Sequence, residues 1–399
     1  MHRRFMGMWQ YGAIFCVTFL VTFILIRESQ IPRSSIIPQG SLPLNFGSPM
    51  DLEHKRQADD TSGSREEAGN PTRVRERKTK LNKTKECMPG SPRLVIMLTY
   101  GRSGSSLTSD IINEHPDVFF YYEPLHNLAK SFGEQQNEYM QKHKKYLHLT
   151  EIAEYNNAAV RMLEKQLTCQ YHRLSRYATL NLHAPVYQST KPLYRCIKNA
   201  LTSKNEESCL LEAQESCEKK SIRFIKTIRF SVLSATLLME KHPCLKLIYL
   251  VRDPRGSYYS KSKMFTSHGS NVTSDAARFC IRLDKDVDNI VKLKERYPER
   301  VLMTRFETIA SHPIVSAKSL YEFLGMSFNK HYALFVYNKT HSQTEACYKW
   351  REKIPYNYVE EFDNHCSDPF FKLGYLPANS VQDLRNLKKA LLFHKDNFS

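Results

Sequence analysis

Short apolar runs alternate with segments of helical periodicity along the chain from residue 93 onwards. The runs are rich in β-branched and aromatic residues and fit buried strands: Leu94–Thr99, Val118–Tyr122, Ile222–Ile228, Leu245–Val251 and Val301–Phe306. Apolar residues recur at helical spacing in Ser106–Glu114, Val232–Lys241, Arg255–Lys263, Ser274–Arg296 and Ile314–Leu324, the last with Gly325 as C-cap. Strands that alternate with helices predict an α/β fold, a parallel sheet flanked by helices, in one domain over residues 93–399.

The N-terminus has a different pattern. The 22 residues Phe5–Ile26 carry no charge, and at about 1.5 Å per residue they form about 33 Å of helix, enough to cross a bilayer core of roughly 30 Å. Arg3 and Arg4 precede them, so the positive-inside rule predicts a cytoplasmic tail over residues 1–4 and a transmembrane signal-anchor over residues 5–26. A cleaved signal peptide is the alternative, but the apolar run is longer than a usual h-region and no small-x-small cleavage site follows it.

Residues 27–92 form a third compositional zone. They contain seven prolines and one aromatic residue, Phe46, and such a composition cannot bury enough apolar surface to offset the ordering entropy. We expect a flexible stem on the lumenal side of the membrane. Four N-x-S/T sequons, at Asn82, Asn271, Asn338 and Asn397, fall on that side, and the first three are our candidate glycosylation sites.

Nine of the ten cysteines follow the predicted span, in a compartment that favours disulfides. Because nine is odd, at least one is free or pairs between chains, which leaves a homodimer open. The sequence contains no C-x-x-C spacing, which argues against a structural zinc site or a thioredoxin-like redox centre. Lysine and arginine outnumber aspartate and glutamate by 58 to 41, a formal charge of +17, which favours partners with phosphate, sulfate or carboxylate groups. Nucleic acid is not expected in the lumen.

The strand that ends at Thr99 leads into a loop that opens a helix, with the sequence Gly101-Arg102-Ser103-Gly104-Ser105-Ser106. Backbone N–H groups at a helix N-terminus, glycines and serine hydroxyls together form an anion site. The loop lacks the lysine of G-x-x-x-x-G-K-[ST] loops and has Arg102 as its cation. A plain strand-to-helix turn is the alternative, and such a turn has no use for an arginine and three serines.

A second anion element follows the strand Leu245–Val251. Arg252 lies at the strand end, Asp253-Pro254 turns the chain into a helix, and Ser260 lies about two helical turns past Arg252. The guanidinium and the hydroxyl can both reach one phosphate. The alternative is a surface arginine that pairs with Asp253.

Glu123 is the best candidate for a general base. It ends an apolar strand, and Pro124 stops the strand there, so the carboxylate is expected at the carboxyl edge of the sheet, where ligands bind. Lys226, from another apolar strand, and Arg102 are candidates to stabilise charge that develops in a transition state. The alternative is that Glu123 caps a helix or pairs with an arginine. Arg229, near Lys226, serves either an acceptor or only the fold.

Taken together, these segments resemble membrane-bound Golgi carbohydrate sulfotransferases, the group that sulfates the 6-hydroxyl of galactose, N-acetylglucosamine or N-acetylgalactosamine and includes the chondroitin 6-sulfotransferases. The similar segments occur in order over about 280 residues, and their combination is more specific than any one of them: Thr99–Ser106, Phe119–Leu125, Lys226–Arg229, Leu250–Arg255 with Ser260, Lys349–Arg351 and Leu373–Tyr375.

The resemblance implies a P-loop-like fold and transfer of a sulfuryl group from 3′-phosphoadenosine-5′-phosphosulfate (PAPS) to a sugar hydroxyl of a glycosaminoglycan or glycoprotein glycan, without a metal. It implies Glu123 as the catalytic base, with Arg102 and Lys226 beside it. It further implies that the donor is bound by Arg102, Ser103, Gly104, Ser105, Ser106, Arg252 and Ser260. The chain departs from the family at His126, where tryptophan is frequent, and at Phe306 and Thr308 in an Arg-Tyr-Glu-Asp pattern.

Two other classes of protein share parts of this pattern. A Golgi glycosyltransferase has the same anchor and stem and uses an Asp-x-Asp metal site, for which Asp284, Asp286 and Asp288 supply the letters. These residues lie in a predicted helix, where carboxylates at i and i+2 point about 200° apart and do not chelate one ion. A non-enzymatic binder of acidic glycans has no need of two separate phosphate elements and a carboxylate.

Overall fold

The computed structural model describes residues 86–133, 148–180, 183–263, 271–341 and 347–393. They belong to one compact unit, Lys80–Ser399. The predicted cytoplasmic tail, signal-anchor and most of the stem lie outside the described residues, as do the sequons at Asn82 and Asn397. Among the helices of the described ranges, none is long and apolar enough to cross a membrane.

Five parallel strands form the central sheet in the order β2-β3-β1-β4-β5. Their bounds are β1 Arg93–Thr99, β2 Val118–Tyr122, β3 Ile222–Thr227, β4 Leu245–Val251 and β5 Val301–Arg305. The predicted parallel α/β sheet is thus confirmed; two strands end one residue earlier than expected, because Ile228 leaves the sheet and Phe306 begins a helix. Tyr122 lies opposite Lys226 and Thr99 opposite Leu250, so the carboxyl ends of the strands share one edge.

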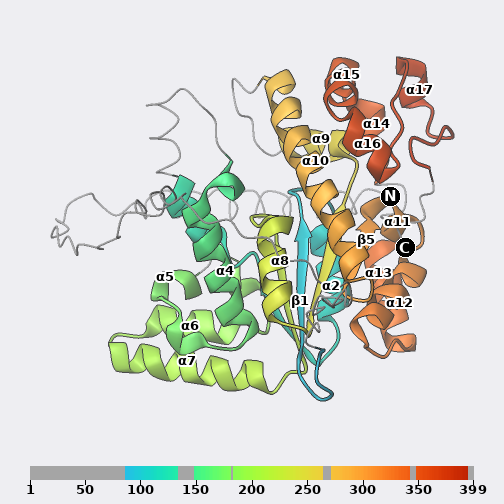
Figure 1. Ribbon diagram of the computed structural model, residues 1–399. Coiled ribbons are helices and arrows are strands. Elements are labelled where there is room, and N and C mark those ends of the chain that lie inside the picture. Colours follow the sequence, from blue (N-terminus) through green and yellow to red (C-terminus); the bar gives the residue numbers. More distant parts are fainter. Residues whose placement is uncertain (1–85, 134–147, 181–182, 264–270, 342–346, 394–399) are drawn as a thin grey trace, which may run out of the picture. The chain divides into compact units, whose positions relative to one another are not determined.

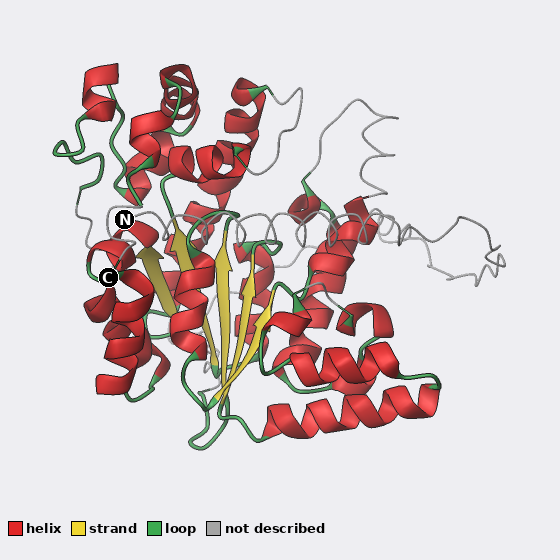
Figure 2. Ribbon diagram, turned by 180° about the vertical axis from the view of Figure 1, so that it is seen from behind, coloured by secondary structure: helices red, strands yellow, loops and turns green. Residues whose placement is uncertain are grey.

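Helices cover both faces of the sheet (Figures 1 and 2). On one face, side chains of β1 pack with α4 (Ala153–Leu167), α8 (Val232–Lys241) and α10 (Val272–Arg296). On the other face they pack with α2 (Ser105–Asn113) and α12 (Pro313–Leu324), and α11 (Phe306–Ser311) and α13 (Lys330–Thr340) contact α12. Side chains of a strand alternate between faces, so Ile96 belongs to the first core and Met97 to the second. The five predicted helices form with boundaries within two residues of those expected, and Gly325 caps α12 in the left-handed conformation.

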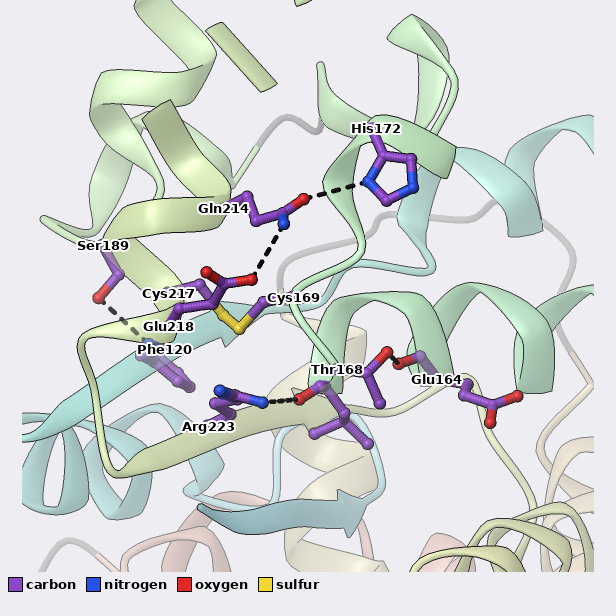
Figure 3. The surroundings of a disulfide bond; sticks show 11 residues. Phe120, Glu164, Thr168, Cys169, His172, Ser189, Gln214, Cys217, Glu218 and Arg223 are labelled. Carbon is purple, nitrogen blue, oxygen red and sulfur yellow. Dashed lines mark hydrogen bonds between the residues drawn. A yellow bond between two sulfur atoms is a disulfide. The ribbon is translucent and has the colours of Figure 1, made fainter. Parts of the chain in front are cut away.

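A helical insertion between β2 and β3, none of whose helices is predicted above, covers the β2 end of the sheet. It contains η1 (Leu149–Glu151), α4, η2 (Tyr171–Arg173), α5 (Arg176–Thr179), η3 (Ala184–Val186), α6 (Lys191–Asn199) and α7 (Ser203–Glu218). Two disulfides, Cys169–Cys217 and Cys196–Cys209, fasten it. Figure 3 shows the first of them joining the turn after α4 to α7, beside Arg223 of β3, whose guanidinium donates to the backbone carbonyl of Leu167 at 3.2 Å.

Three of the C-terminal helices pack against α9 (Pro254–Ser262) or α10, and the last packs against the first of them. The C-terminal helices are α14 (Trp350–Lys353), α15 (Tyr356–His365), α16 (Ser367–Leu373) and α17 (Val381–Arg385). Arg351, 2% exposed, donates to four backbone carbonyls in and after α17, at 2.8–2.9 Å. Arg255 of α9 is also buried and binds Asp363 of α15 at 2.8 Å, so this arginine joins the C-terminal helices to the helix that follows β4.

Four disulfides account for eight of the nine cysteines that follow the predicted span. Besides the two in the insertion they are Cys87–Cys244 and Cys280–Cys366. The ninth, Cys347, is buried, and burial raises the pKa of its thiol to about 12. Cys87 lies within the predicted stem, so the C-terminal end of that segment is covalently attached to the domain. The boundary at residue 92 stays a prediction.

Candidate active site

The loop after β1 has a backbone that requires glycine at one position. Gly104 is the N-cap of α2 and has φ +77°. A Cβ atom there would lie 2.0 Å from the ring of Phe306, so both the conformation and the space exclude larger residues. Ser105 then begins α2. Ser103 is predicted to bind the sulfuryl donor. It is 1% exposed, and its hydroxyl lies 2.7 Å from the Tyr100 carbonyl and 2.5 Å from the Thr99 hydroxyl, so its side chain stabilises the loop.

The two predicted anion elements meet in space. Arg102, with φ +65°, donates from Nε to the hydroxyl of Ser260 at 3.0 Å. Arg252 donates from Nη1 to the Arg102 carbonyl at 3.1 Å. Residues 150 positions apart in the chain thus converge on one place at the carboxyl edge of the sheet, where the N-terminus of α2 also lies. Such a convergence of N–H groups and guanidinium groups suits a ligand with more than one anionic group.

Arg252 does not pair with Asp253, so that alternative interpretation is wrong. Asp253 instead binds Arg255, accepting from Nε at 2.9 Å and from Nη2 at 2.8 Å. Arg252 packs over the ring of Phe306, 5.1 Å from its centroid. Its Nε is buried and has no hydrogen-bond partner among the described residues. A buried N–H without a partner costs about 1–3 kcal/mol, which a bound anion would recover.

Glu123 lies directly after β2 with φ +52°, a conformation that costs a non-glycine residue of order 1–3 kcal/mol and is frequent at functional sites. Its backbone N–H donates to the Lys226 carbonyl at 2.8 Å. Its carboxylate, in a residue only 3% exposed, forms ion pairs with Lys226 and Arg229. Pairing with an arginine, one of the alternatives for Glu123, is therefore observed. The arginine is Arg229, whose role the sequence left open between the acceptor and the fold.

Aromatic and imidazole rings surround this carboxylate. The ammonium group of Lys226 lies 4.3 Å from the ring centroid of Tyr122, and the Tyr122 hydroxyl lies 2.7 Å from that of Ser106 on α2. His126 and His183 contact each other at 5.4 Å between ring centroids. Burial lowers the pKa of both histidines, with Arg229 as a further cause, while Glu123 opposes the shift. No sequence signal identified His183, because its neighbours come from a segment far away in the chain.

The Asp-x-Asp sequence does not form a metal site. Asp284 and Asp288 both bind Lys372, at 2.7 and 2.6 Å. Asp286 points into the core and accepts from the Tyr100 hydroxyl at 2.7 Å; burial raises the pKa of its carboxyl. Within the described ranges there is no group of three His, Cys, Asp or Glu side chains that could hold a metal ion.

Comparisons with known proteins identify the family of the chain. A model of the "Sulfotransferase family" matches residues 93–330. Carbohydrate sulfotransferase 1 of Mus musculus is 24% identical over 76% of this chain and 84% of its own, and carbohydrate sulfotransferase 6 of Homo sapiens is 22% identical over 73% and 83%. Two solved structures, STF9 of Mycobacterium avium and mouse SULT7A1 complexed with PAP, are each 13% identical. The match to STF9 has a TM-score of 0.39 and covers 70% of this chain and 76% of that chain. The match to SULT7A1 has a TM-score of 0.37 and covers 73% of this chain and 86% of that chain. Since the family model covers more than half of the chain, the protein belongs to the sulfotransferase family.

Proposed function

We propose that the protein transfers a sulfuryl group from PAPS to a hydroxyl group of a glycan, the primary 6-hydroxyl of an N-acetylhexosamine or galactose. The observation that carries the proposal is the meeting of Arg102, Arg252 and Ser260 beside the N-terminus of α2. PAPS has anionic groups at both the 5′ and 3′ positions, and two separate anion elements that converge match that distribution. The curated relatives are named carbohydrate sulfotransferases, which favours a sugar acceptor.

The loop residues bind the 5′-phosphosulfate in this proposal. The backbone N–H groups of Gly104, Ser105 and Ser106 at the start of α2, with the Arg102 guanidinium, compensate its charge. Arg252 and Ser260 bind the 3′-phosphate. The N–H of Arg252 that has no partner among the described residues gives this arginine a further donor for that phosphate.

Glu123 takes the proton of the acceptor hydroxyl as that oxygen attacks sulfur. The bond from sulfur to the acceptor oxygen forms, the bond from sulfur to the 5′-phosphate oxygen breaks, and 3′-phosphoadenosine-5′-phosphate leaves. Lys226 and Arg229 hold the carboxylate in position through their ion pairs. In this proposal Lys226, at the carboxyl end of β3, also stabilises the charge that develops on the oxygen between sulfur and the 5′-phosphate. Glu307, next to the Phe306 departure, binds the backbone N–H of Asp253 at 2.9 Å and so supports the element that carries Arg252.

We further propose a single-pass type II protein of the Golgi, with residues 1–4 cytoplasmic, 5–26 in the membrane, 27–92 as stem and 93–399 as the sulfotransferase domain in the lumen. Four disulfides, three within the domain and one that joins it to Cys87 of the stem, support an oxidising compartment. Of the candidate glycosylation sites, Asn338 is exposed on α13, and Asn271 caps α10 by accepting from the Thr273 N–H at 2.9 Å.

Incubation of the purified protein with radiolabelled PAPS and a panel of chondroitin, keratan and simple N-acetylhexosamine acceptors tests the proposal. We expect label in at least one acceptor, with release of 3′-phosphoadenosine-5′-phosphate. Consumption of a nucleotide-sugar without any sulfation would favour the glycosyltransferase alternative. Binding of an acidic glycan without turnover of either donor would favour the non-enzymatic binder.

A further inference from the structure

Tyr122, the last residue of β2, contacts both halves of the proposed site. Its hydroxyl lies 2.7 Å from the hydroxyl of Ser106, in the first turn of α2, where the 5′-phosphosulfate is proposed to bind. The ammonium group of Lys226, which pairs with Glu123, lies 4.3 Å from the centroid of the Tyr122 ring. A sulfuryl group that moves from the 5′-phosphate to an acceptor at Glu123 passes between these two halves, so the Tyr122 side chain lies beside its path.

The register of the sheet determines this position. Tyr122 lies opposite Lys226 in the parallel pairing of β2 with β3, and side chains of a strand alternate between the two faces. Phe120, two residues earlier, belongs to the core on the α2 face of the sheet, so Tyr122 faces α2 as well. The positive φ of Glu123 interrupts the alternation. As a result the phenol and the carboxylate of two successive residues both reach Lys226.

The ring of Tyr122 is held by its neighbours. It stacks on the ring of Tyr187, with 5.2 Å between the centroids and 21° between the planes, and the imidazole of His183 contacts it edge-on at 5.0 Å. Tyr187 is itself anchored, because its hydroxyl lies 3.3 Å from a carboxylate oxygen of Asp110 on α2. The Tyr122 hydroxyl is thus directed at the start of α2 before any ligand binds, and such preorganised donors are the usual source of electrostatic stabilisation in enzymes.

The pair of hydroxyls has a proton to spare for a ligand. A phenol and a serine hydroxyl each carry one proton, and either can be the donor in the contact between Tyr122 and Ser106. When Ser106 donates to the Tyr122 oxygen, the Tyr122 proton is available to an oxygen of the sulfuryl group. The Lys226 ammonium group over the ring draws electron density toward itself and makes the phenol a stronger donor.

We propose that Tyr122 is a further catalytic residue, whose hydroxyl donates a hydrogen bond to a non-bridging oxygen of the sulfuryl group during transfer. The inference rests on the proposed sulfuryl transfer from PAPS and adds a residue to that site. Tyr122 keeps its proton throughout. The proton of the acceptor hydroxyl goes to Glu123, and the electron pair of the breaking bond from sulfur to oxygen stays on the 5′-phosphate. The phenol orients the sulfuryl group and stabilises the negative charge on its oxygens.

Tyr122→Phe in the full-length protein tests the proposal, because it keeps the ring and removes only the hydroxyl. We expect the single-turnover rate of sulfate transfer from bound PAPS to fall by about 10- to 100-fold, the contribution of one hydrogen bond to a charged group. The nucleotide product, 3′-phosphoadenosine-5′-phosphate, lacks the sulfuryl group, so its Kd in calorimetry stays unchanged. The contact of the hydroxyl with Ser106 is exposed, so the melting temperature stays close to that of the wild type.

Tyr187→Phe is the matched control. It is the same change in the ring that stacks on Tyr122, but its hydroxyl binds Asp110, so both the transfer rate and the nucleotide affinity stay at the wild-type values. A wild-type transfer rate in Tyr122→Phe would overturn the proposal while sulfuryl transfer stands. A Kd for 3′-phosphoadenosine-5′-phosphate that rises in proportion to the lost rate would show that the hydroxyl only holds α2 in place, and would also overturn it. Absence of label in every acceptor with the wild type would instead contradict the proposed function.

Discussion

The ion pair between Glu123 and Lys226 provides the sharpest test of the site, because the structure assigns the pair a cost in stability as well as a role in turnover. The side chains of the two residues are 4% and 3% exposed. Glu123→Gln removes the anion and leaves the Lys226 ammonium group buried beside a neutral amide, while Arg229, 25% exposed, can turn to solvent. Breaking a buried pair by removal of one partner costs about 3–5 kcal/mol. Turnover falls in addition by roughly 10²- to 10⁴-fold, the usual contribution of a general base.

Lys226→Met costs less, because Glu123 retains Arg229 as a partner; the loss of one hydrogen bond to a charged group is about 1.5–3 kcal/mol. The double variant Glu123→Gln/Lys226→Met no longer buries an unpaired charge, so a double-mutant cycle should give a coupling energy of about 2–3 kcal/mol. Turnover in the double variant stays as low as in Glu123→Gln, because the second substitution removes the unpaired charge and supplies no base.

Urea unfolding, followed by the fluorescence of the buried Trp350, and transfer of radiolabelled sulfate in the same preparation measure both quantities. Glu240→Gln is the matched control: its carboxylate, 43% exposed, pairs with Arg296, which is 55% exposed, and an exposed pair contributes about 0–1 kcal/mol. Recovery of turnover in the double variant, which still lacks the carboxylate, would show that Glu123 is structural. Wild-type turnover in a folded Glu123→Gln protein would remove it from the mechanism altogether.

Three other predictions follow from the donor site and the C-terminal helices. Gly104→Ala places a Cβ 2.0 Å from the Phe306 ring at a positive φ, so it weakens binding of 3′-phosphoadenosine-5′-phosphate by about 1–3 kcal/mol in calorimetry. Gly101→Ala is the control: its Cβ meets one atom at 3.9 Å, and the variant binds the nucleotide normally. Arg252→Ala weakens the same ligand by about 1.5–3 kcal/mol and leaves a nucleotide without the 3′-phosphate unaffected; equal losses for both would contradict a 3′-phosphate role. Burial raises the pKa of Asp363 to about 6, against an opposing ion pair, so the folded protein binds this proton more tightly than the unfolded chain does. The stability from that proton is complete below about pH 4 and is lost as the pH rises through 6, and Asp363→Asn removes this slope in urea unfolding at pH 4–7.

Local patterns in the sequence determined the sheet and the loops at its edge. The five apolar runs form the five strands, because a strand buried on both faces needs a continuous apolar sequence wherever it lies in the fold. Gly104 and Gly325 have positive φ values, because the need for glycine arises within the turn itself. The candidate donor-binding residues Arg102, Arg252 and Ser260 could likewise be chosen from short motifs. Each lies in the loop or helix that follows a strand.

Partners that are distant in the chain could be identified only from the tertiary structure. The sequence has 58 lysines and arginines, and no local pattern indicates that Lys226 and Arg229 pair with Glu123. Nor does a local pattern indicate that Asp253 binds Arg255 and not Arg252. Likewise, only the tertiary structure shows which cysteines pair, and that Tyr121, Gln166 and Tyr171 line one cavity. Hydrogen bonds and ion pairs act over about 3–4 Å, and which side chains come within that distance depends on how the helical insertion and the C-terminal helices pack against the sheet.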